Sequence, residues 1–199
     1  HIRPPYGFLH QGNQDEVEFA ANAASWLDDK INEIGASNVA AFVAEPIQGA
    51  GGVIVPPAGY FKHIQEICSR HDILFVADEV ITGFGRTGAW SGSRLWGVQP
   101  DMMCIAKAIT SGYFPLGAAL INERIATAFE SDSSGKAAIG HGYTYSGHPV
   151  GAAAGVGGGH EAAVGRAYLR FHQPRLGFSS LGRAAGCWTR TVSDGKRCR

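Results

Sequence analysis

Apolar residues along the chain follow a helical period in three segments. Between residues 15 and 34 they recur at alternating spacings of three and four, which predicts one helix with a single buried stripe that ends at Gly35. The stripe consists of Val17, Ala20, Ala24, Leu27, Ile31 and Ile34. Residues 59–71 show the same period, and residues 123–131, ERIATAFES, predict a third helix.

Four short stretches between and around these helices are almost continuously apolar. They read NVAAFVAEP, ILFVADEV, DMMCIAKAI and LGAALIN. Such runs are typical of strands that are buried on both faces of a parallel sheet. Since strands and helices alternate along the chain, the sequence predicts an α/β fold with a mostly parallel sheet.

Composition adds bounds to this picture. The chain has 199 residues, 45% of them hydrophobic, which is enough for one domain with a sizeable core. The 17 basic and 17 acidic residues cancel, so the charge gives no indication of nucleic acid or an anionic membrane. No apolar run approaches the roughly 20 residues of a membrane helix, and from the first residues given we expect no signal peptide. The four cysteines lack a CxxC pattern and favour a reducing compartment, which we take to be the cytoplasm.

The charge separates along the chain. Residues 155–199 hold eight basic and two acidic residues and lose the hydrophobic period. We therefore expect an ordered domain over residues 1–154 and an atypical basic tail over 155–199, which is either out of frame or disordered. A nucleic-acid-binding tail is the alternative, and the other reading frames of the coding DNA test the first interpretation. His1 stands where Met would be, inside a loop-like segment, so we also expect that an N-terminal part is missing.

Charged side chains follow the predicted strands. Ligands of α/β sheets bind beyond the carboxyl ends of the strands, which is where Glu45 and Asp78 lie. Asp78 and Glu79 are adjacent and should point to opposite faces, which argues against a glycosidase-like pair. One of them would face a site. A solvated strand end is the alternative.

Lys107 lies inside the third of these stretches, directly after its apolar residues MMCIA and almost without charged neighbours. Desolvation there would lower the pKa of its amine and make the amine a better nucleophile. A lysine that forms an imine, together with a carboxylate that faces a pyridinium nitrogen, is the pair that pyridoxal phosphate requires. The alternative is an ordinary surface lysine.

Four linked motifs now carry a family resemblance. They read AEPIQGAGGVIVPP, VADEVITGFGRTG, IAKAITSGYFPLGAAL and HGYTYSGHP. Their order and spacing over residues 1–154 resemble class III pyridoxal-phosphate aminotransferases, most of all the ω-amino acid:pyruvate branch. The resemblance implies the large domain of a fold-type I pyridoxal-phosphate transferase, truncated at both ends. The family's upstream phosphate loop and its C-terminal small domain have no counterpart in this chain.

The resemblance also implies roles for single residues. Asp78 would keep the pyridine nitrogen protonated, and Val80 would pack against the ring. Lys107 would link covalently to pyridoxal 5'-phosphate and then move the substrate proton. Thr144 would bind the cofactor phosphate of the partner subunit in a homodimer. Glu45 resembles an acid near the family's site, and a supporting role behind the contacting residues is its alternative.

The implied reaction moves an amino group from an ω-amino acid or amine to pyruvate or another 2-oxo acid. Ala50 and Ile81 stand where ornithine- or GABA-type relatives carry Glu and Gln, which favours the pyruvate branch. Two alternatives stay open. One is a non-catalytic fragment that only dimerises or binds cofactor weakly. The other is an aminomutase or a decarboxylating relative.

Other motifs have simpler interpretations. The GFGRTG segment lacks the order of a dinucleotide or P-loop motif, so its glycines are expected to form tight turns near a dimer interface. His141 and His148 lack the accompanying ligands of a metal site and are expected to be ordinary loop histidines. Arg86 is either an anion contact or part of a structural ion pair.

Overall fold

The computed structural model describes residues 1–136 and 142–162. Its helices are α1 (Gly7–His10), α2 (Glu16–Ile34), α3 (Tyr60–Arg70), α4 (Gly92–Trp96), α5 (Glu123–Ser131) and α6 (Pro149–Ala162). Two short 3-10 helices are η1 (Ala36–Asn38) and η2 (Lys107–Thr110). The strands are β1 (Ala41–Ala44), β2 (Leu74–Asp78), β3 (Met102–Ile105) and β4 (Ala118–Ile121).

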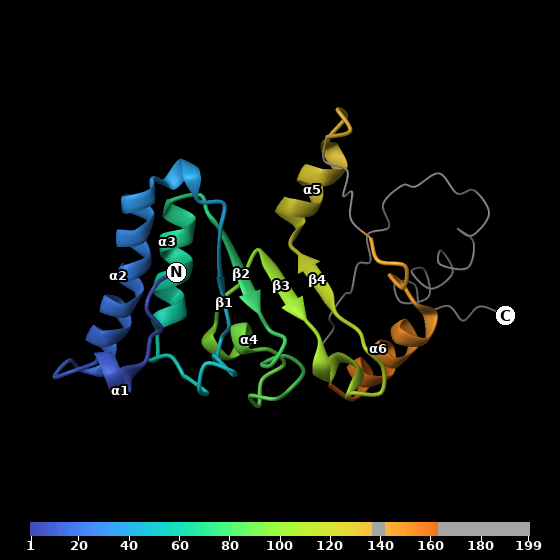
Figure 1. Ribbon diagram of the computed structural model, residues 1–199, viewed down its shortest axis with the longest axis horizontal. Coiled ribbons are helices and arrows are strands. Elements are labelled where there is room, and N and C mark those ends of the chain that lie inside the picture. The colour runs from blue at the N-terminus through green and yellow to red at the C-terminus, as the bar shows by residue number, and fades with distance from the viewer. Residues whose placement is uncertain (137–141, 163–199) are drawn as a thin grey trace. The chain divides into compact units, whose positions relative to one another are not determined.

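The four described strands form one sheet in the order β1-β2-β3-β4 (Figure 1). The pairs β1–β2 and β2–β3 are parallel, whereas β4 runs antiparallel to β3. This arrangement confirms the predicted α/β fold with a mostly parallel sheet. Among the described residues, no helix combines the length and the apolar character that crossing a membrane would need.

Helix α2 begins and ends where the sequence predicts. The Asp15 carboxylate accepts the Glu18 N–H at 2.8 Å, which caps the first turn, and Gly35 ends the helix at φ +89°. The middle of the predicted stripe is buried, but its two ends are not, because Val17 is 72% and Ile34 is 46% exposed. The predicted buried face is therefore correct only over the helix centre.

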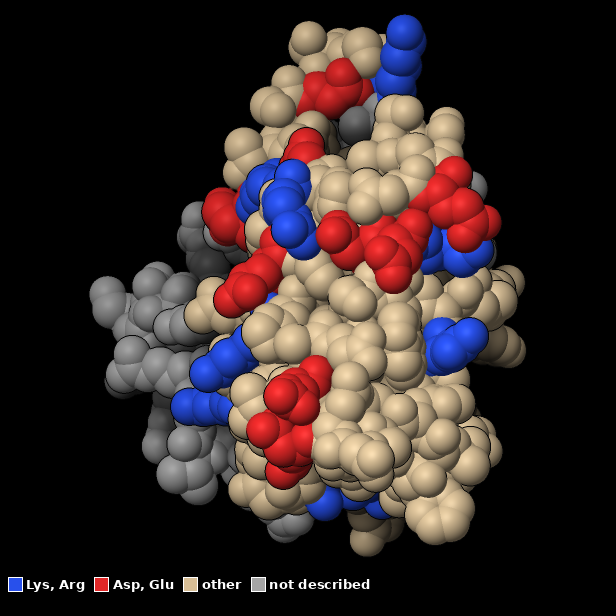
Figure 2. Space-filling view, turned by 90° about the vertical axis from the view of Figure 1, so that its left-hand side faces the viewer, with Lys and Arg blue, Asp and Glu red and all other residues tan. Residues whose placement is uncertain are grey.

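Helices α2 and α3 pack against each other and against one face of the sheet (Figure 1). Their shared core is built on fully buried side chains such as Phe19, Ile31 and Ile64. The outer surface of this layer carries acidic and basic side chains side by side (Figure 2). The two helices thus bury an apolar face against the sheet and expose a charged face, as amphipathic surface helices do.

The opposite face of the sheet is different. Phe42 and Ala44 of β1 pack against the α2–α3 core, so Val43 between them points to the other side. Val43 is 61% exposed. In the part of the chain that the structure describes, this face of β1 is therefore open.

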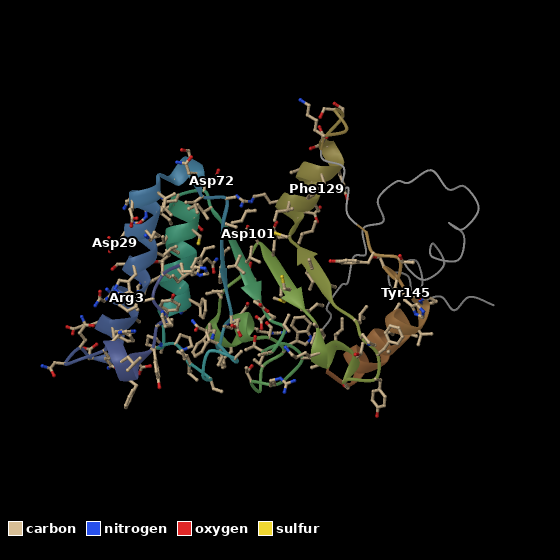
Figure 3. All side chains as sticks on the ribbon, in the orientation of Figure 1. Arg3, Asp29, Asp72, Asp101, Phe129 and Tyr145 are labelled. Atoms are coloured by element: carbon tan, nitrogen blue, oxygen red, sulfur yellow. The ribbon has the colours of Figure 1, made fainter. Side chains whose placement is uncertain are left out.

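Asp101 organises the starting end of β3. Its carboxylate accepts the Phe75 N–H at 2.9 Å and the side-chain amide of Asn122 at 2.8 Å, and it pairs with Arg124 at 3.3 Å. These contacts join β2 and the segment after β4 to β3. Figure 3 labels Asp101, and Figure 1 shows β2 and β3 running away from that end of the sheet. The contacts of Asp101 thus fix the positions of β2, β3 and β4 relative to one another, and with them the residues at the other end of these strands.

Helix α6 packs closely on η2. Three glycines of α6 face η2 or the segment that follows it; they are Gly151, Gly155 and Gly158. Added Cβ atoms there would lie 2.9 Å from the Phe114 ring, 3.0 Å from Leu116 and 2.6 Å from the Ile109 carbonyl oxygen, respectively. The helix continues to Ala162, so the predicted boundary at residue 154 falls inside an element. The rest of the predicted tail, residues 163–199, lies outside the described residues.

Candidate active site

Three chemically important side chains follow strands whose carboxyl ends meet at one edge of the sheet. Glu45 comes directly after β1, Asp78 is the last residue of β2, and Lys107 lies two residues after β3. In Figure 1 this is the edge to which the β2 and β3 arrowheads point, and η2 and α6 adjoin it. The fold therefore brings the predicted residues to the position where α/β sheets bind ligands.

Asp78 is half-buried, and its Oδ1 accepts the Val80 N–H at 3.1 Å. This bond closes a tight turn at the strand end and places Val80 in that turn. Among the described residues, Oδ2 accepts no hydrogen bond, so the carboxylate keeps room for another donor. That capacity fits the protonated nitrogen of a pyridine ring.

Glu79 lies in a different environment. It is fully buried and accepts hydrogen bonds from Gly92, Ser93 and Thr82. Gly92 and Ser93 begin α4, so Glu79 points toward that helix. The two neighbouring carboxylates thus have separate surroundings, as strand alternation predicts.

Cys104 is the cross-strand neighbour of Asp78. Burial raises the pKa of its thiol, and the negative charge of Asp78 raises that pKa further. The thiol is therefore held neutral next to the carboxylate. Sequence reasoning assigned no place in the site to Cys104, because its position became informative only with the β2–β3 register.

Lys107 begins η2 in the left-handed region, at φ +48°, and Ser111 follows the element at φ +51°. Non-glycine residues adopt this conformation at a cost of roughly 1–3 kcal/mol, and such residues cluster at functional sites. The prediction that Lys107 is desolvated is wrong within this chain, because the residue is exposed. Its apolar neighbours Ile105 and Ile109 turn inward, whereas Lys107 points outward.

Glu45 shapes the loop after β1. Its Oε2 accepts the Gly49 N–H at 3.0 Å, which favours the supporting role over direct contact with a ligand. Gly49 is closely packed, since an added Cβ would lie 2.3 Å from Cδ1 of Ile81. The loops after β1 and β2 therefore touch. Arg86 belongs to the second loop and donates from Nε to the Ile81 carbonyl at 2.6 Å, so its observed role is structural.

Thr144 is exposed in a turn just before α6. In the same turn His148 stacks on Phe114 at 5.0 Å, and its Nδ1 accepts the Val150 N–H at 3.2 Å. His148 is thus a structural loop histidine, while His141 lies outside the described residues. Tyr145, labelled in Figure 3, is 78% exposed beside α6. The described residues include no cluster of side chains that could hold a metal ion.

Comparison with known proteins identifies the class. The model of the class III aminotransferases matches residues 3–158, and the chain belongs to this family. Enzymes of this family use pyridoxal 5'-phosphate. Asp78, Lys107 and Thr144 carry a carboxylate, an amine and a hydroxyl, which are kinds of group that can bind a ring nitrogen, an aldehyde and a phosphate.

Two relatives show how far the sequence similarity extends. The chain is 52% identical over 153 residues to putrescine–pyruvate aminotransferase of Pseudomonas aeruginosa, covering 77% of this chain and 33% of that protein. It is 47% identical over 147 residues to vanillin aminotransferase of Capsicum frutescens, covering 74% and 32%. The chain thus spans about a third of the length of these relatives.

Solved structures agree with this fold. An (S)-enantioselective ω-transaminase from Thermomicrobium roseum matches with a TM-score of 0.77 at 42% identity, covering 81% of this chain and 36% of that one. An amine transaminase from an uncultivated Pseudomonas species, in its pyridoxal-phosphate-bound form, matches with a TM-score of 0.77 at 48% identity and the same coverage. Both neighbours support the large domain of a fold-type I transferase.

Proposed function

We propose that the protein transfers an amino group from an ω-amino acid or amine to pyruvate or another 2-oxo acid. The observation that carries this proposal is that Asp78 and Lys107 meet at one edge of the sheet. Oδ2 of Asp78 accepts no hydrogen bond from the residues that the structure describes, and Lys107 has left-handed backbone. The similarity to a putrescine–pyruvate aminotransferase supports the choice of amine and pyruvate.

Each residue then has a task at the bound cofactor. Pyridoxal phosphate supplies an electron sink for the carbanion that forms at the substrate carbon. The Asp78 carboxylate would keep a proton on the ring nitrogen, and Val80 would pack against the ring. The Lys107 amine would hold the cofactor and would move the proton at the substrate carbon. Glu45 keeps the neighbouring loop in place.

The direct test uses the full-length protein with pyridoxal phosphate. Alanine formed from pyruvate and putrescine or β-alanine would support the proposal. Bound cofactor without amino transfer from any ω-amino acid or primary amine would contradict it. We place this reaction in the cytoplasm, on the support of the free thiols of Cys68 and Cys104, which fit a reducing compartment.

The active unit in this proposal is a homodimer in which Thr144 binds the phosphate of the partner subunit. Its exposure in the turn before α6 is compatible with such a reach. Mixing inactive Lys107→Ala subunits with inactive Thr144→Ala subunits should restore activity, because one site of each mixed dimer carries neither defect. No recovery despite demonstrated subunit exchange would place Thr144 outside the partner's site.

The 199-residue chain by itself is proposed to be inactive. Catalytic groups must be held within roughly 0.5 Å of productive geometry by their surroundings, and Lys107 and Thr144 are exposed here. We expect poor solubility, weak covalent capture of added pyridoxal phosphate and no alanine production from pyruvate. Sustained multiple turnover by the purified chain would contradict this expectation.

A further inference from the structure

Glu79 is a fully buried carboxylate that has no cationic partner among the described ion pairs. Four donors converge on it instead. Oε1 accepts the N–H and the hydroxyl of Ser93, both at 2.6 Å. Oε2 accepts the Gly92 N–H at 2.8 Å and the Thr82 hydroxyl. A buried charge is tolerated only when it is hydrogen-bonded in this way.

Gly92 and Ser93, which bind Glu79, begin helix α4, and this helix also contacts the segment that follows β1. The indole N–H of Trp96 donates to the Pro46 carbonyl at 3.0 Å. Gly92 lies so close to this segment that an added Cβ would be 2.4 Å from Cβ of Pro46. Helix α4 therefore connects the residues after β1 to the residues after β2. Glu79 is its anchor on the β2 side.

We propose that Glu79 is a positioning residue, which holds Asp78 in place by anchoring α4. Glu79 and Asp78 share a peptide unit, so a displacement of the buried Glu79 carboxylate also turns the half-buried carboxylate of Asp78. The Asp78–Val80 turn then loses its fixed relation to Glu45 and Pro46. This inference rests on the proposed function for its catalytic consequence, but its structural part concerns this chain alone.

The geometry makes Glu79→Gln a sharp test. Each oxygen of Glu79 accepts one backbone N–H, from Ser93 on one side and Gly92 on the other. A glutamine amide has only one oxygen, so either orientation sets its NH2 group against a backbone N–H. The amide cannot satisfy the site without movement of the β2 end or of α4.

Two gentler variants and one control complete the series. Thr82→Val and Ser93→Ala each remove one hydroxyl donor and leave the charge and the backbone amides in place. Ser91→Ala is the control, because the Ser91 hydroxyl caps α4 by accepting the Arg94 N–H at 3.1 Å without contacting Glu79. Ser91→Ala therefore weakens α4 by removing its N-terminal cap, while the hydrogen bonds of Glu79 remain.

Two measurements on the full-length protein decide the matter. The first is hydrogen exchange of the Val80 amide in the protein without cofactor, because that N–H donates to Asp78. The second is a separate determination of kcat and of the KM for the amine in the enzyme with bound pyridoxal phosphate. We expect Glu79→Gln to speed Val80 exchange and to lower kcat by about 10- to 100-fold with little change in KM, as a small misplacement of a catalytic group does. Thr82→Val and Ser93→Ala should show the same pattern more weakly.

Ser91→Ala should lower the melting temperature but leave Val80 exchange and kcat unchanged. Equal loss of kcat in Ser91→Ala and Glu79→Gln at matched stability would overturn the proposal, and so would unchanged Val80 exchange in Glu79→Gln. If Glu79→Gln does not fold, the two hydroxyl variants decide by the same criteria. If the unaltered protein transaminates no amine, the proposed function fails, whereas Val80 exchange still decides whether Glu79 holds the Asp78 turn.

Discussion

The helical layer over β1 and β2 contrasts with the edge where the strands end. In the layer, Phe19 and Ile64 have no exposed surface. At the edge Lys107 is exposed, and Tyr113 nearby is 90% exposed. The same sheet thus has one side whose packing is complete and one end whose chemical groups still face outward. Stability and chemistry depend on different residues, and substitutions should separate them.

The largest effect is expected at the edge. In the full-length protein, Lys107→Ala should abolish the covalent link to pyridoxal phosphate, because the other lysines that the structure describes lie in α2, in α3 and after α5, away from the carboxyl end of β3. Borohydride reduction and peptide mapping should find the label on Lys107 in the unaltered protein and nowhere in the variant. Label on Lys62 or Lys136 instead would show that the site has been assigned to the wrong residue.

The next effect is expected one strand away. Asp78→Asn should leave the cofactor bound and slow turnover by about 10²–10³-fold, because an amide cannot keep the ring nitrogen protonated. Its melting temperature should stay close to that of the unaltered protein, since the free Oδ2 makes no internal hydrogen bond among the described residues. Near-normal turnover in Asp78→Asn would contradict the assignment of Asp78 to the ring nitrogen, whatever the effect of Glu79→Gln.

A pair of apolar truncations tests the layer. Ile64→Ala removes a side chain with no exposed surface and should lower the free energy of unfolding by about 2–5 kcal/mol. Val43→Ala, on the open face at 61% exposure, should change it by about 0.5 kcal/mol or less. Urea unfolding measures both. A large cost at Val43 would show that this face is covered in the protein under test.

The smallest effect concerns two thiols. Burial and the charge of Asp101 raise the pKa of Cys68 to about 12, while Cys104 is only half-buried, so Cys104 should react faster with a thiol reagent. Asp78→Asn should speed Cys104 severalfold below its pKa, because removal of the neighbouring negative charge lowers that pKa and increases the thiolate fraction. Mass mapping separates the two thiols. An unchanged Cys104 rate would contradict the contact with Asp78.

Helices α2, α3 and α5 and the four strands could be predicted from the sequence because each has a strong local pattern, whereas α1, α4 and α6 were not predicted. The cap Asp15, the centre of the α2 stripe and the four apolar runs are local signals, and all appear in the fold. The exposed ends of α2 were not predictable, because periodicity gives the direction of a side chain but not how far the neighbouring α3 extends.

The residues of the candidate site could be predicted from the sequence, but their burial and their hydrogen-bond partners could not. Strand alternation separated Asp78 from Glu79, yet nothing local shows that Glu79 would meet the amides of Gly92 and Ser93 thirteen and fourteen positions later. The desolvation predicted for Lys107 failed for the same reason. Apolar neighbours in sequence do not surround a residue when the backbone turns between them.

The close contact between α6 and η2 bears on how mutational scans of this protein would be interpreted. A methyl group at Gly158 would meet the Ile109 carbonyl, whereas Gly157, one position earlier, faces open space. A deep scan would therefore record strong intolerance at Gly158, similar to that at Lys107, although the atoms nearest to an added Cβ at Gly158 belong to the backbone of Ile109 and Thr110. Intolerance to substitution around this site thus has two causes, the chemistry of Lys107 and the close packing at Gly158. Gly157 is the internal reference, because tolerance at Gly157 shows that the intolerance at Gly158 comes from packing.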